Sequence, residues 1–599
     1  MCGFLASLLA GGVAEATVRP KPRTRQPAPA AKTSLAVRRW MGNMTLREEV
    51  AQLIFIPFSG TFPNSRSRQY WKFLRLIRDT RVGGLVLVNY SNGRTTPKAE
   101  PYALAAFLNR MQRQAKTPLL VGADFERGAS MRVNGTTPFP QAMAFGAAGD
   151  PVLAHYEGEV TAREARALGV QWIFFPVADV NHNPDNPVIN IRSYGEDPRA
   201  VAGMVKAFIE GAHSDRRNYV LTTAKHFPGH GDTAQDTHLN LATVAASRDR
   251  LEQLELVPFR AAIGAGVDSV MTAHVAVPAL APPDVPATLA PQILTDLLRN
   301  RLGFQGLVIT DALDMGGIAK GYSTREAAVE ALKAGADALL MPPDPDVALR
   351  AVVAAVEDGR LPRRRIRESV AKILAAKERL GLDRQRMVDL DALGDVLDSP
   401  EAEDRAQQVA ERAVTLVRNT DALVPLHAPQ RTCYLVLTES RYSTEGQTFA
   451  QEVRKRFSSA ALATLDPSMT REAMDEVLRK LPDCEVYGVA AFSSVVAYRG
   501  SVGLSGELPE LIRALIGSHR PVVLIALGNP YLLRDFPGVA AYLATFSTAV
   551  PSEIAAVRAL FGELDIRGHL PVTIPGLAQY GEGLQLQATR AATVAPRLQ

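Results

Sequence analysis

The chain has 599 residues, of which 47% are hydrophobic and 22% are charged, and its net charge is +5. This composition is typical of a globular protein that is too long for one hydrophobic core, so we expect two domains and a tail. A small net charge without a dense basic face excludes nucleic acid as a partner. No apolar run reaches about 18 residues, so we expect no membrane-spanning helix.

Residues 1–34 predict a leader followed by a Pro-rich linker. Residues 4–13 are apolar, and Ala14-Glu15-Ala16 fits the cleavage site of a signal peptide. The basic residues that normally precede such an apolar run are missing, so a disordered leader on a cytoplasmic protein is the alternative. We expect a periplasmic or secreted protein.

Eight short apolar runs alternate with longer amphipathic stretches between residues 35 and 385. Apolar strands between helices indicate a parallel sheet that is covered on both faces. Eight such units predict an α/β domain of the (β/α)8 TIM-barrel type, and an open doubly wound sheet is the runner-up. The runs are 53–58, 84–88, 119–123, 172–177, 220–224, 269–273, 307–310 and 338–341.

After a linker over 386–400, residues 401–580 predict a smaller α/β sandwich domain. Its expected strands are 434–438, 485–491, 522–527 and 541–546. Residues 581–599 should form a tail that is poorly ordered beyond Leu584. Three cysteines are too few for a disulfide scaffold, and we expect Cys433 and Cys484 to be buried free thiols.

Polar residues follow the C-terminal ends of five predicted strands, which is where TIM-barrel enzymes build their sites. Packing alone does not explain five such positions in register, so these side chains should converge on one mouth of the barrel. They are Asp124, Asp179 with Asn181, Lys225 with His226, His274, and Asp311.

The loop after the fifth strand carries most of the titratable groups. It reads Lys225-His-Phe-Pro-Gly-His-Gly-Asp-Thr233 and continues to Asp236-Thr-His238. Its glycines and proline predict a mobile loop. Asp236 and His238 are two residues apart and project to the same side of an extended segment. A carboxylate that binds one imidazole nitrogen leaves the other to donate a proton, so this pair predicts an acid/base dyad.

Asp311 ends the seventh strand and is followed by Ala-Leu-Asp314. A carboxylate at that point is costly unless it is paired or functional, and we predict that Asp311 is a nucleophile. Capping of the next helix is the alternative, and it suits Asp314 better. A carboxylate nucleophile with a separate acid is the arrangement of retaining glycoside hydrolysis.

A metal site is the competing interpretation of the same loop. His226, His230 and His238, together with Asp232 and Asp236, could form a coordination shell. However, His226 and His230 would share a face only on a helix, which the intervening Phe-Pro-Gly prevents. We therefore predict no metal and no organic cofactor.

These segments together resemble glycoside hydrolase family 3, and most of all its β-N-acetylglucosaminidase branch in a two-domain form. The resemblance covers nearly the whole chain. It continues in Gly83-Gly-Leu-Val-Leu87, Asp179-Val-Asn-His-Asn-Pro184, Ile191-Arg-Ser-Tyr-Gly-Glu-Asp-Pro198, 265–274, 413–419, 423–426 and 568–572.

The resemblance implies a role for each matching residue. Asp311 matches the nucleophile, His238 the acid/base and Asp236 its partner. The residues that would hold sugar hydroxyls are Asp124, Arg132, Arg192, Lys225 and His226. The segment 124–132 departs from the family pattern Asp-x-Glu-Gly-Gly-Arg-Val-x-Arg at Arg127 and at the Ala-Ser pair that follows Gly128.

The resemblance also implies the activity. We expect a monomeric, retaining exo-β-N-acetylglucosaminidase that acts on GlcNAc-containing oligosaccharides from cell wall (muropeptides) or chitin. A β-glucosidase of the same family is an alternative, although the resemblance implies that such enzymes take their acid from the second domain. A non-catalytic sugar-binding protein is a third possibility, and a metallohydrolase that uses the histidine cluster is a fourth.

Overall fold

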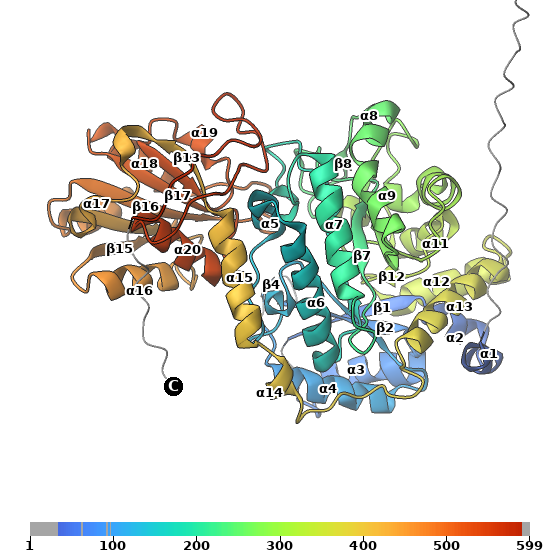
Figure 1. The fold of residues 1–599 in the computed structure, drawn as a ribbon. Helices are drawn as coiled ribbons and strands as arrows, with labels where there is room; N and C mark the ends of the chain where they lie inside the picture. The colour runs from blue at the N-terminus through green and yellow to red at the C-terminus, as the bar shows by residue number, and fades with distance from the viewer. Residues whose placement is uncertain (1–33, 61–63, 92–93, 96, 590–599) are drawn as a thin grey trace, which may run out of the picture.

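The computed structural model describes residues 34–60, 64–91, 94–95 and 97–589. Two domains lie side by side, and helix α15 (Pro400–Ala413) runs between them (Figure 1). The first domain comprises elements α1 to α14, and the second comprises β13 to α20. The predicted leader, apart from Ser34, and Cys2 lie outside the described residues.

The first domain is built on two curled parallel sheets. One has the order β12-β1-β2-β5-β6 and the other the order β11-β9-β7. Isolated parallel bridges connect the two sheets, one between Trp172 of β6 and Leu221 just before β7, the other between Ile309 of β11 and Ala338 just before β12. The strands are β1 (Ile54–Ser59), β2 (Gly84–Val88), β5 (Leu120–Ala123), β6 (Trp172–Ile173), β7 (Thr223–Phe227), β9 (Ser269–Thr272), β11 (Leu307–Ile309) and β12 (Leu339–Leu340).

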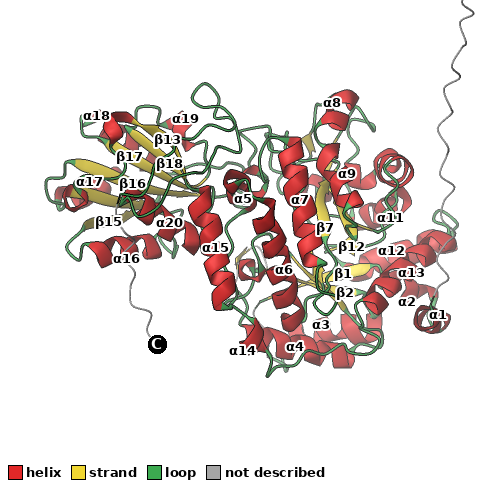
Figure 2. Ribbon diagram, in the orientation of Figure 1, coloured by secondary structure: helices red, strands yellow, loops and turns green. Residues whose placement is uncertain are grey.

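Each of the eight predicted apolar runs overlaps one of these strands, so the predicted parallel pairing is confirmed. The strands are buried on both faces, and helices lie outside them (Figure 2). The longer helices of this domain are α1 (Leu35–Gly42), α3 (Arg68–Arg75), α4 (Pro101–Gln114), α6 (Pro151–Leu168), α7 (Pro198–Ala212), α9 (Leu256–Gly264), α11 (Thr324–Ala334), α12 (Pro345–Glu357) and α13 (Arg363–Arg379).

Shorter elements complete the first domain, and several of them carry the loops at the carboxyl ends of the strands. Helix η5 (Gln292–Arg301) is a π-helix. The short π-helix η1 (Leu76–Thr80) follows α3. Other short elements include α2 (Leu46–Ala51), α5 (Ala142–Ala148), α8 (Arg248–Gln253), α10 (Gly316–Ala319), α14 (Leu393–Val396), β8 (Ala242–Thr243) and β10 (Val275–Ala276). Among the described helices, none combines the length and the apolarity that crossing a membrane requires.

The buried carboxylate of Asp337 ties β11 and β12 to the outer helices. Its oxygens accept hydrogen bonds from Arg299 Nη2 at 2.5 Å, Ser369 Oγ at 2.6 Å and the Val308 backbone N–H at 3.1 Å. Burial alone would raise the pKa of this carboxyl, but Arg299 and Lys372 among its neighbours lower the pKa to about 2. Asp337 is therefore a charged structural link at the amino end of β12.

We expect Asp337→Asn to lower the free energy of unfolding by about 3 kcal/mol at pH 7, because it leaves cations without their buried partner. A depressed carboxyl pKa stabilises the fold above about pH 4 and loses that contribution as the pH falls towards 2. The difference between wild type and variant should therefore shrink over this range, as measured by denaturant unfolding. Asp284→Asn, at an exposed loop position, serves as the control.

The second domain contains a six-stranded sheet of order β13-β18-β17-β16-β14-β15, in which β13 alone is antiparallel to its neighbour. Alternate residues of β14 enter different cores, Tyr434 and Val436 on one face and Leu435 and Leu437 on the other. The second domain is therefore a mixed α/β fold with apolar residues on both faces of its sheet. The strands are β13 (Thr415–Asn419), β14 (Thr432–Leu437), β15 (Ala461–Leu465), β16 (Val486–Ser493), β17 (Val522–Gly528) and β18 (Ala541–Ala544).

The edge strands β13 and β15 were not among the predicted strands. Their residues are only partly buried, so they lack the continuous apolar run that marked the four central strands. The helices of this domain are α16 (Gln447–Arg456), α17 (Arg471–Arg479), α18 (Leu508–Gly517), α19 (Leu532–Asp535) and α20 (Val550–Leu560).

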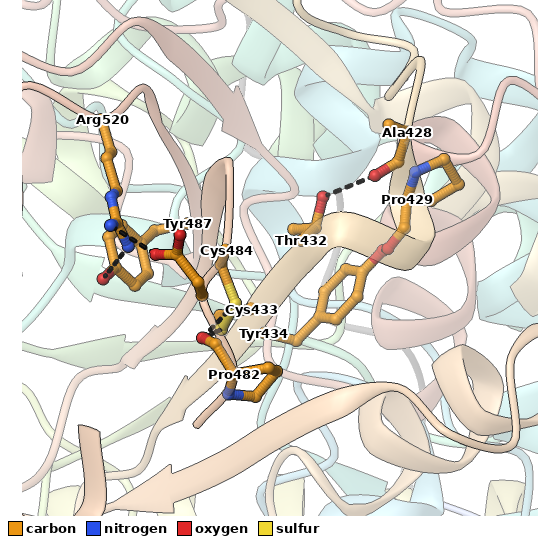
Figure 3. Close-up of a disulfide and its surroundings, with 10 residues drawn as sticks. Ala428, Pro429, Thr432, Cys433, Tyr434, Pro482, Cys484, Tyr487 and Arg520 are labelled. Atoms are coloured by element: carbon orange, nitrogen blue, oxygen red, sulfur yellow. Dashed lines mark hydrogen bonds and ion pairs between the residues drawn. A yellow bond between two sulfur atoms is a disulfide. The ribbon is translucent and has the colours of Figure 1, made fainter. Parts of the chain in front are cut away.

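The prediction of free thiols at Cys433 and Cys484 is wrong, because the two cysteines form a disulfide (Figure 3). Cys433 lies in β14, and Cys484 lies just before β16, which pairs with β14. Their Cα atoms are 5.7 Å apart, within the range that a disulfide spans. Nothing in the sequence placed these strands next to each other, so the pairing could not be inferred there.

The predicted disordered tail begins too early. Leu584 pairs with Leu416 of β13, and Leu586 pairs with Ile566. The backbone N–H of Thr589 still donates to the Gly562 carbonyl at 2.9 Å. The prediction is therefore wrong for residues 585–589, and residues 590–599 lie outside the described part of the chain.

Candidate active site

A cavity of about 900 Å³ opens where the carboxyl ends of the parallel strands face the second domain. Four of the predicted strand-end residues line it, namely Asp124, Lys225, His226 and Asp311. Asp179 and His274 lie directly behind this lining. The amide of Asn181 instead donates to the Tyr531 hydroxyl of the second domain at 3.0 Å.

A network of charged side chains forms one wall of the cavity. Lys225 Nζ lies 2.8 Å from Asp124 Oδ1 and 2.6 Å from Glu126 Oε1. Arg132 reaches the other oxygen of Asp124 at 3.1 Å. Arg192 donates to both oxygens of Glu126, at 2.7 and 2.8 Å. The segment 124–132 is thereby joined to strand β7 and to the segment before α7.

The charges in this network stabilise one another. Burial alone would raise the pKa of the Glu126 carboxyl, but Arg192 and Lys225 hold it well below its usual range. Burial disfavours the charged Lys225 ammonium, yet Asp124 and Glu126 raise its pKa overall. The network is therefore fully ionised, and it presents charged donors and acceptors to a polar ligand.

Glu126 has no role in the sequence-based prediction, although it lies two residues after Asp124. That spacing puts both carboxylates on the same side of an extended segment, which is the signal that could have identified it. Asp179 was predicted only as a strand-end residue. Its Oδ2 lies 2.7 Å from His226 Nδ1, and its Oδ1 accepts the His230 backbone N–H at 2.8 Å.

His226 is oriented by this carboxylate. The hydrogen bond to Asp179 occupies Nδ1, and Nε2 lies 3.4 Å from Arg192 Nη2 on the cavity side. Burial alone would raise the pKa of the Asp179 carboxyl. The charge and hydrogen bonds of His226 outweigh this effect and bring the pKa below its usual value, so Asp179 is ionised. This partner fixes the imidazole ring and its tautomer.

Asp311 follows β11 and lines the cavity as an ionised carboxylate. Its Oδ1 accepts the Ala312 backbone N–H at 2.7 Å. Burial alone would raise the pKa of this carboxyl, but His226 and His274 bring it below its usual value. A charged carboxylate held at a cavity wall can attack an electrophilic carbon.

His274 supports Asp311 from behind. Its Nε2 lies 3.0 Å from the Ala312 carbonyl, and its Nδ1 lies 2.8 Å from Thr288 Oγ1. Burial lowers the pKa of His274. The ring therefore positions the backbone next to Asp311.

The hydrogen bond that the spacing of Asp236 and His238 predicts is present. His238 Nδ1 lies 2.7 Å from Asp236 Oδ1, which also accepts the His238 backbone N–H at 2.9 Å. Burial would raise the pKa of Asp236, but these two hydrogen bonds lower it. Since Nδ1 is occupied, Nε2 of His238 is the nitrogen left to exchange a proton with a ligand.

His230 belongs to the framework of the loop. Its Nε2 lies 2.9 Å from Thr237 Oγ1 and its Nδ1 lies 3.1 Å from Thr233 Oγ1. Burial lowers the pKa of His230 to about 4, which keeps it neutral. His226 of β7 and the loop residues His230 and His238 thus have three separate sets of partners. Within the described ranges, no group of three or more His, Cys, Asp or Glu residues could hold a metal ion.

Residues 45–376 match the model of the glycosyl hydrolase family 3 N-terminal domain. The chain belongs to glycoside hydrolase family 3. The curated relatives of this family 3 enzyme include a β-N-acetylglucosaminidase/β-glucosidase of Cellulomonas fimi, 30% identical over 529 residues, with 83% of this chain and 89% of that protein covered. Another is β-hexosaminidase A of Pseudoalteromonas piscicida, 30% identical over 558 residues, with 83% and 90% covered.

Solved structures agree with this assignment over both domains. A family 3 β-N-acetylglucosaminidase from Paenibacillus sp. strain FPU-7 is 32% identical and superposes with a TM-score of 0.79, covering 89% of this chain and 99% of that one. A β-glucoside phosphorylase is 25% identical with a TM-score of 0.79, covering 90% and 96%. The protein is therefore a glycoside hydrolase of a mixed α/β, two-domain architecture.

The second domain of this family 3 enzyme reaches the loop that carries Asp236 and His238. The Tyr498 ring packs against His238 with centroids 5.1 Å apart, and the Gly500 backbone N–H donates to Asp236 Oδ2 at 3.3 Å. Contacts such as Asn181–Tyr531 and the bonds from Thr573 to Glu196 hold the domains together beside the cavity. The sequence carried no local signal of this contact.

We expect Tyr498→Leu to lower turnover of an aryl β-glycoside about tenfold, because His238 loses the surface that fixes its ring. KM should change less than kcat, since Tyr498 contacts His238, the predicted acid/base, rather than the charged network around Lys225. Steady-state kinetics together with a melting curve would check this. Tyr442→Leu, at an exposed position of the same domain, is the matched control. Equal kinetics of the two variants would contradict the positioning role.

Proposed function

We propose that this enzyme is a retaining exo-β-N-acetylglucosaminidase that removes terminal β-linked GlcNAc from cell-wall or chitin-derived oligosaccharides. The observation that carries the proposal is the 2.7 Å Asp236–His238 pair on a first-domain loop, which lines the same cavity as the separate ionised Asp311. The names of the Cellulomonas, Pseudoalteromonas and Paenibacillus relatives support the choice of sugar.

In the first step, a carboxylate oxygen of Asp311 attacks the anomeric carbon of the terminal sugar. The glycosidic C–O bond breaks, and protonated His238 gives its Nε2 proton to the departing oxygen. A glycosyl ester of Asp311 and the shortened saccharide result. The Asp236 carboxylate stabilises the imidazolium before this transfer and fixes the ring.

In the second step, neutral His238 takes a proton from water, whose oxygen attacks the anomeric carbon. The ester bond breaks, the sugar leaves, and Asp311 returns as a carboxylate. Two inversions give net retention of the β-configuration. Asp311, His238 and water account for every bond that is made or broken in the two steps.

The charged network is suited to a sugar at the end of a chain. We assign hydroxyl binding to Asp124, Arg132, Lys225, Arg192 and His226. Lys225 lines the cavity but is only 1% exposed, so a saccharide bound to it would extend away from this buried wall. This geometry favours an exo mode of action.

The test compares aryl β-N-acetylglucosaminide with aryl β-glucoside, and peptidoglycan fragments with chitobiose. We expect the acetamido sugar to be preferred, and proton NMR should detect the β-anomer first. Faster cleavage of the glucoside would favour the β-glucosidase alternative. The name of the Cellulomonas relative includes both activities. Release of the α-anomer first would contradict the retaining mechanism.

We also propose that the first domain, residues 35–385, is a closed (β/α)8 barrel, which the bridges at both sheet edges support. We further propose a monomer that works in the periplasm or outside the cell. The Cys433–Cys484 disulfide supports this location, because disulfides persist in oxidising compartments. Cell fractionation tests the proposed location, and gel filtration tests the proposed monomer.

A further inference from the structure

The cationic side chains that line the cavity fall into two groups. Arg132, Arg192 and Lys225 each pair with a carboxylate of the network at its inner wall. Lys98 and Arg127 also line the cavity, yet among the described residues neither side chain has an ion pair or hydrogen bond within contact distance. This second pair has no part in the proposed reaction.

Arg127 is held in place by its backbone. It precedes Gly128, whose φ of 74° lies in the left-handed region and where an added Cβ would come within 2.9 Å of the Thr137 carbonyl. The Arg127 carbonyl accepts a hydrogen bond from Ser130 Oγ at 3.1 Å. Arg127 thus lines the cavity from a tight, packed turn, which fixes the point where its side chain begins.

The two cations are close enough to act on each other. Burial lowers the pKa of Arg127, and Glu445 of the second domain opposes this effect. Partial burial and the charge of Arg127 lower the pKa of Lys98 to about 8. Two mutually repelling cations in a partly desolvated corner are unfavourable until an anion joins them.

Glu445 does not neutralise the charge of Arg127 by direct contact. Its Oε2 instead accepts a hydrogen bond from Ser443 Oγ at 3.0 Å, within its own domain, and it forms no ion pair with Arg127 among the described residues. Lys98 lies at the cavity rim, where its side chain reaches solvent but loses part of its hydration to the surrounding protein, whereas Lys225 is buried. An anion between Arg127 and Lys98 would therefore lie outside the position of the terminal sugar.

We propose that Arg127, assisted by Lys98, binds a carboxylate on the leaving saccharide, so that this enzyme prefers acidic oligosaccharides to neutral ones. Guanidinium binds a carboxylate through two parallel N–H···O bonds, which gives both affinity and orientation. A sugar with an ether-linked lactic acid or a uronic acid carries such a group. The inference rests on the proposed exo-glycosidase function, because it concerns the saccharide that leaves in that reaction.

The experiment uses the full-length enzyme and two disaccharides with the same terminal GlcNAc. One is chitobiose, and the other carries a 3-O-lactyl carboxylate on its reducing sugar. We expect Arg127→Gln to lower kcat/KM on the acidic disaccharide about tenfold or more and to change chitobiose hydrolysis less than twofold. Arg127→Lys should retain an intermediate preference. Arg199→Gln, at an exposed position of α7, removes the same charge elsewhere and should change neither value.

Glu445→Gln provides an independent variant, since removing its negative charge should raise the preference for the acidic disaccharide. Added salt should weaken hydrolysis of the acidic disaccharide more than that of chitobiose. Equal losses on both disaccharides in Arg127→Gln, or no loss on either, would overturn the proposal. An aryl β-N-acetylglucosaminide assay on wild type tests the proposed function separately, and calorimetric binding of the acidic monosaccharide tests the anion site without turnover.

Discussion

Asp311→Ala should reduce turnover of an aryl β-N-acetylglucosaminide by at least about 10⁴-fold, because no covalent intermediate can then form. The carboxylate lines the cavity, is kept ionised by His226 and His274, and is held by the Ala312 N–H. Binding should survive better than catalysis, since the charged network that includes Lys225 does not depend on Asp311. Steady-state kinetics and calorimetry with GlcNAc would measure the two effects.

The shorter side chain also leaves room for a small external nucleophile. Azide should therefore restore part of the activity of Asp311→Ala and give the α-glycosyl azide, the product of a single inversion. Asp284→Ala, at an exposed loop position, controls for the loss of a carboxylate. Retention of more than about a tenth of wild-type activity in Asp311→Ala would rule out Asp311 as the nucleophile.

His238→Ala should have the second large effect, and its size should depend on the leaving group. Substrates with poor leaving groups need a proton, and general acid catalysis contributes about 10²- to 10⁴-fold. We therefore expect a loss of at least about 10³-fold on chitobiose and a much smaller loss on a dinitrophenyl glycoside in the first step. Pre-steady-state release of the phenol separates this step from hydrolysis of the ester.

Asp236→Asn tests the dyad rather than the acid alone. The amide cannot stabilise the imidazolium, so we expect a loss of about 10²-fold and a changed pH profile for kcat. His427→Ala, which alters an exposed histidine of the second domain, is the control. If His238→Ala lost equal activity on every leaving group, the proton would have to come from another residue.

The sequence contained more of the candidate site than of the contacts that complete it. Asp124, Lys225, His226 and Asp311 could be placed together because parallel strands end on the same side of the sheet. Asp236 and His238 could be paired because two residues of an extended segment share a side. Glu126 followed the same spacing rule as Asp236 and His238, but its two cationic partners lie 66 and 99 residues away.

The strands also divide into those that the sequence indicates and those that it does not. Continuous apolar runs predicted the eight strands of the two curled parallel sheets, because strands buried on both faces require apolar residues throughout. The half-exposed edges β13 and β15 gave no such signal. The pairing of Cys433 with Cys484 depended on which strands are neighbours in the second domain, and local patterns do not encode that order.

The sequence by itself therefore determined the apolar periodicity, the strand-end chemistry and the acid/base spacing, since each depends on residues close together in the chain. The tertiary structure decided which distant groups meet. It brought Tyr498 and Gly500 to the His238–Asp236 pair and placed Glu445 across the cavity from Arg127. Such contacts depend on how two folded domains pack, and packing is a property of complementary surfaces rather than of any local pattern.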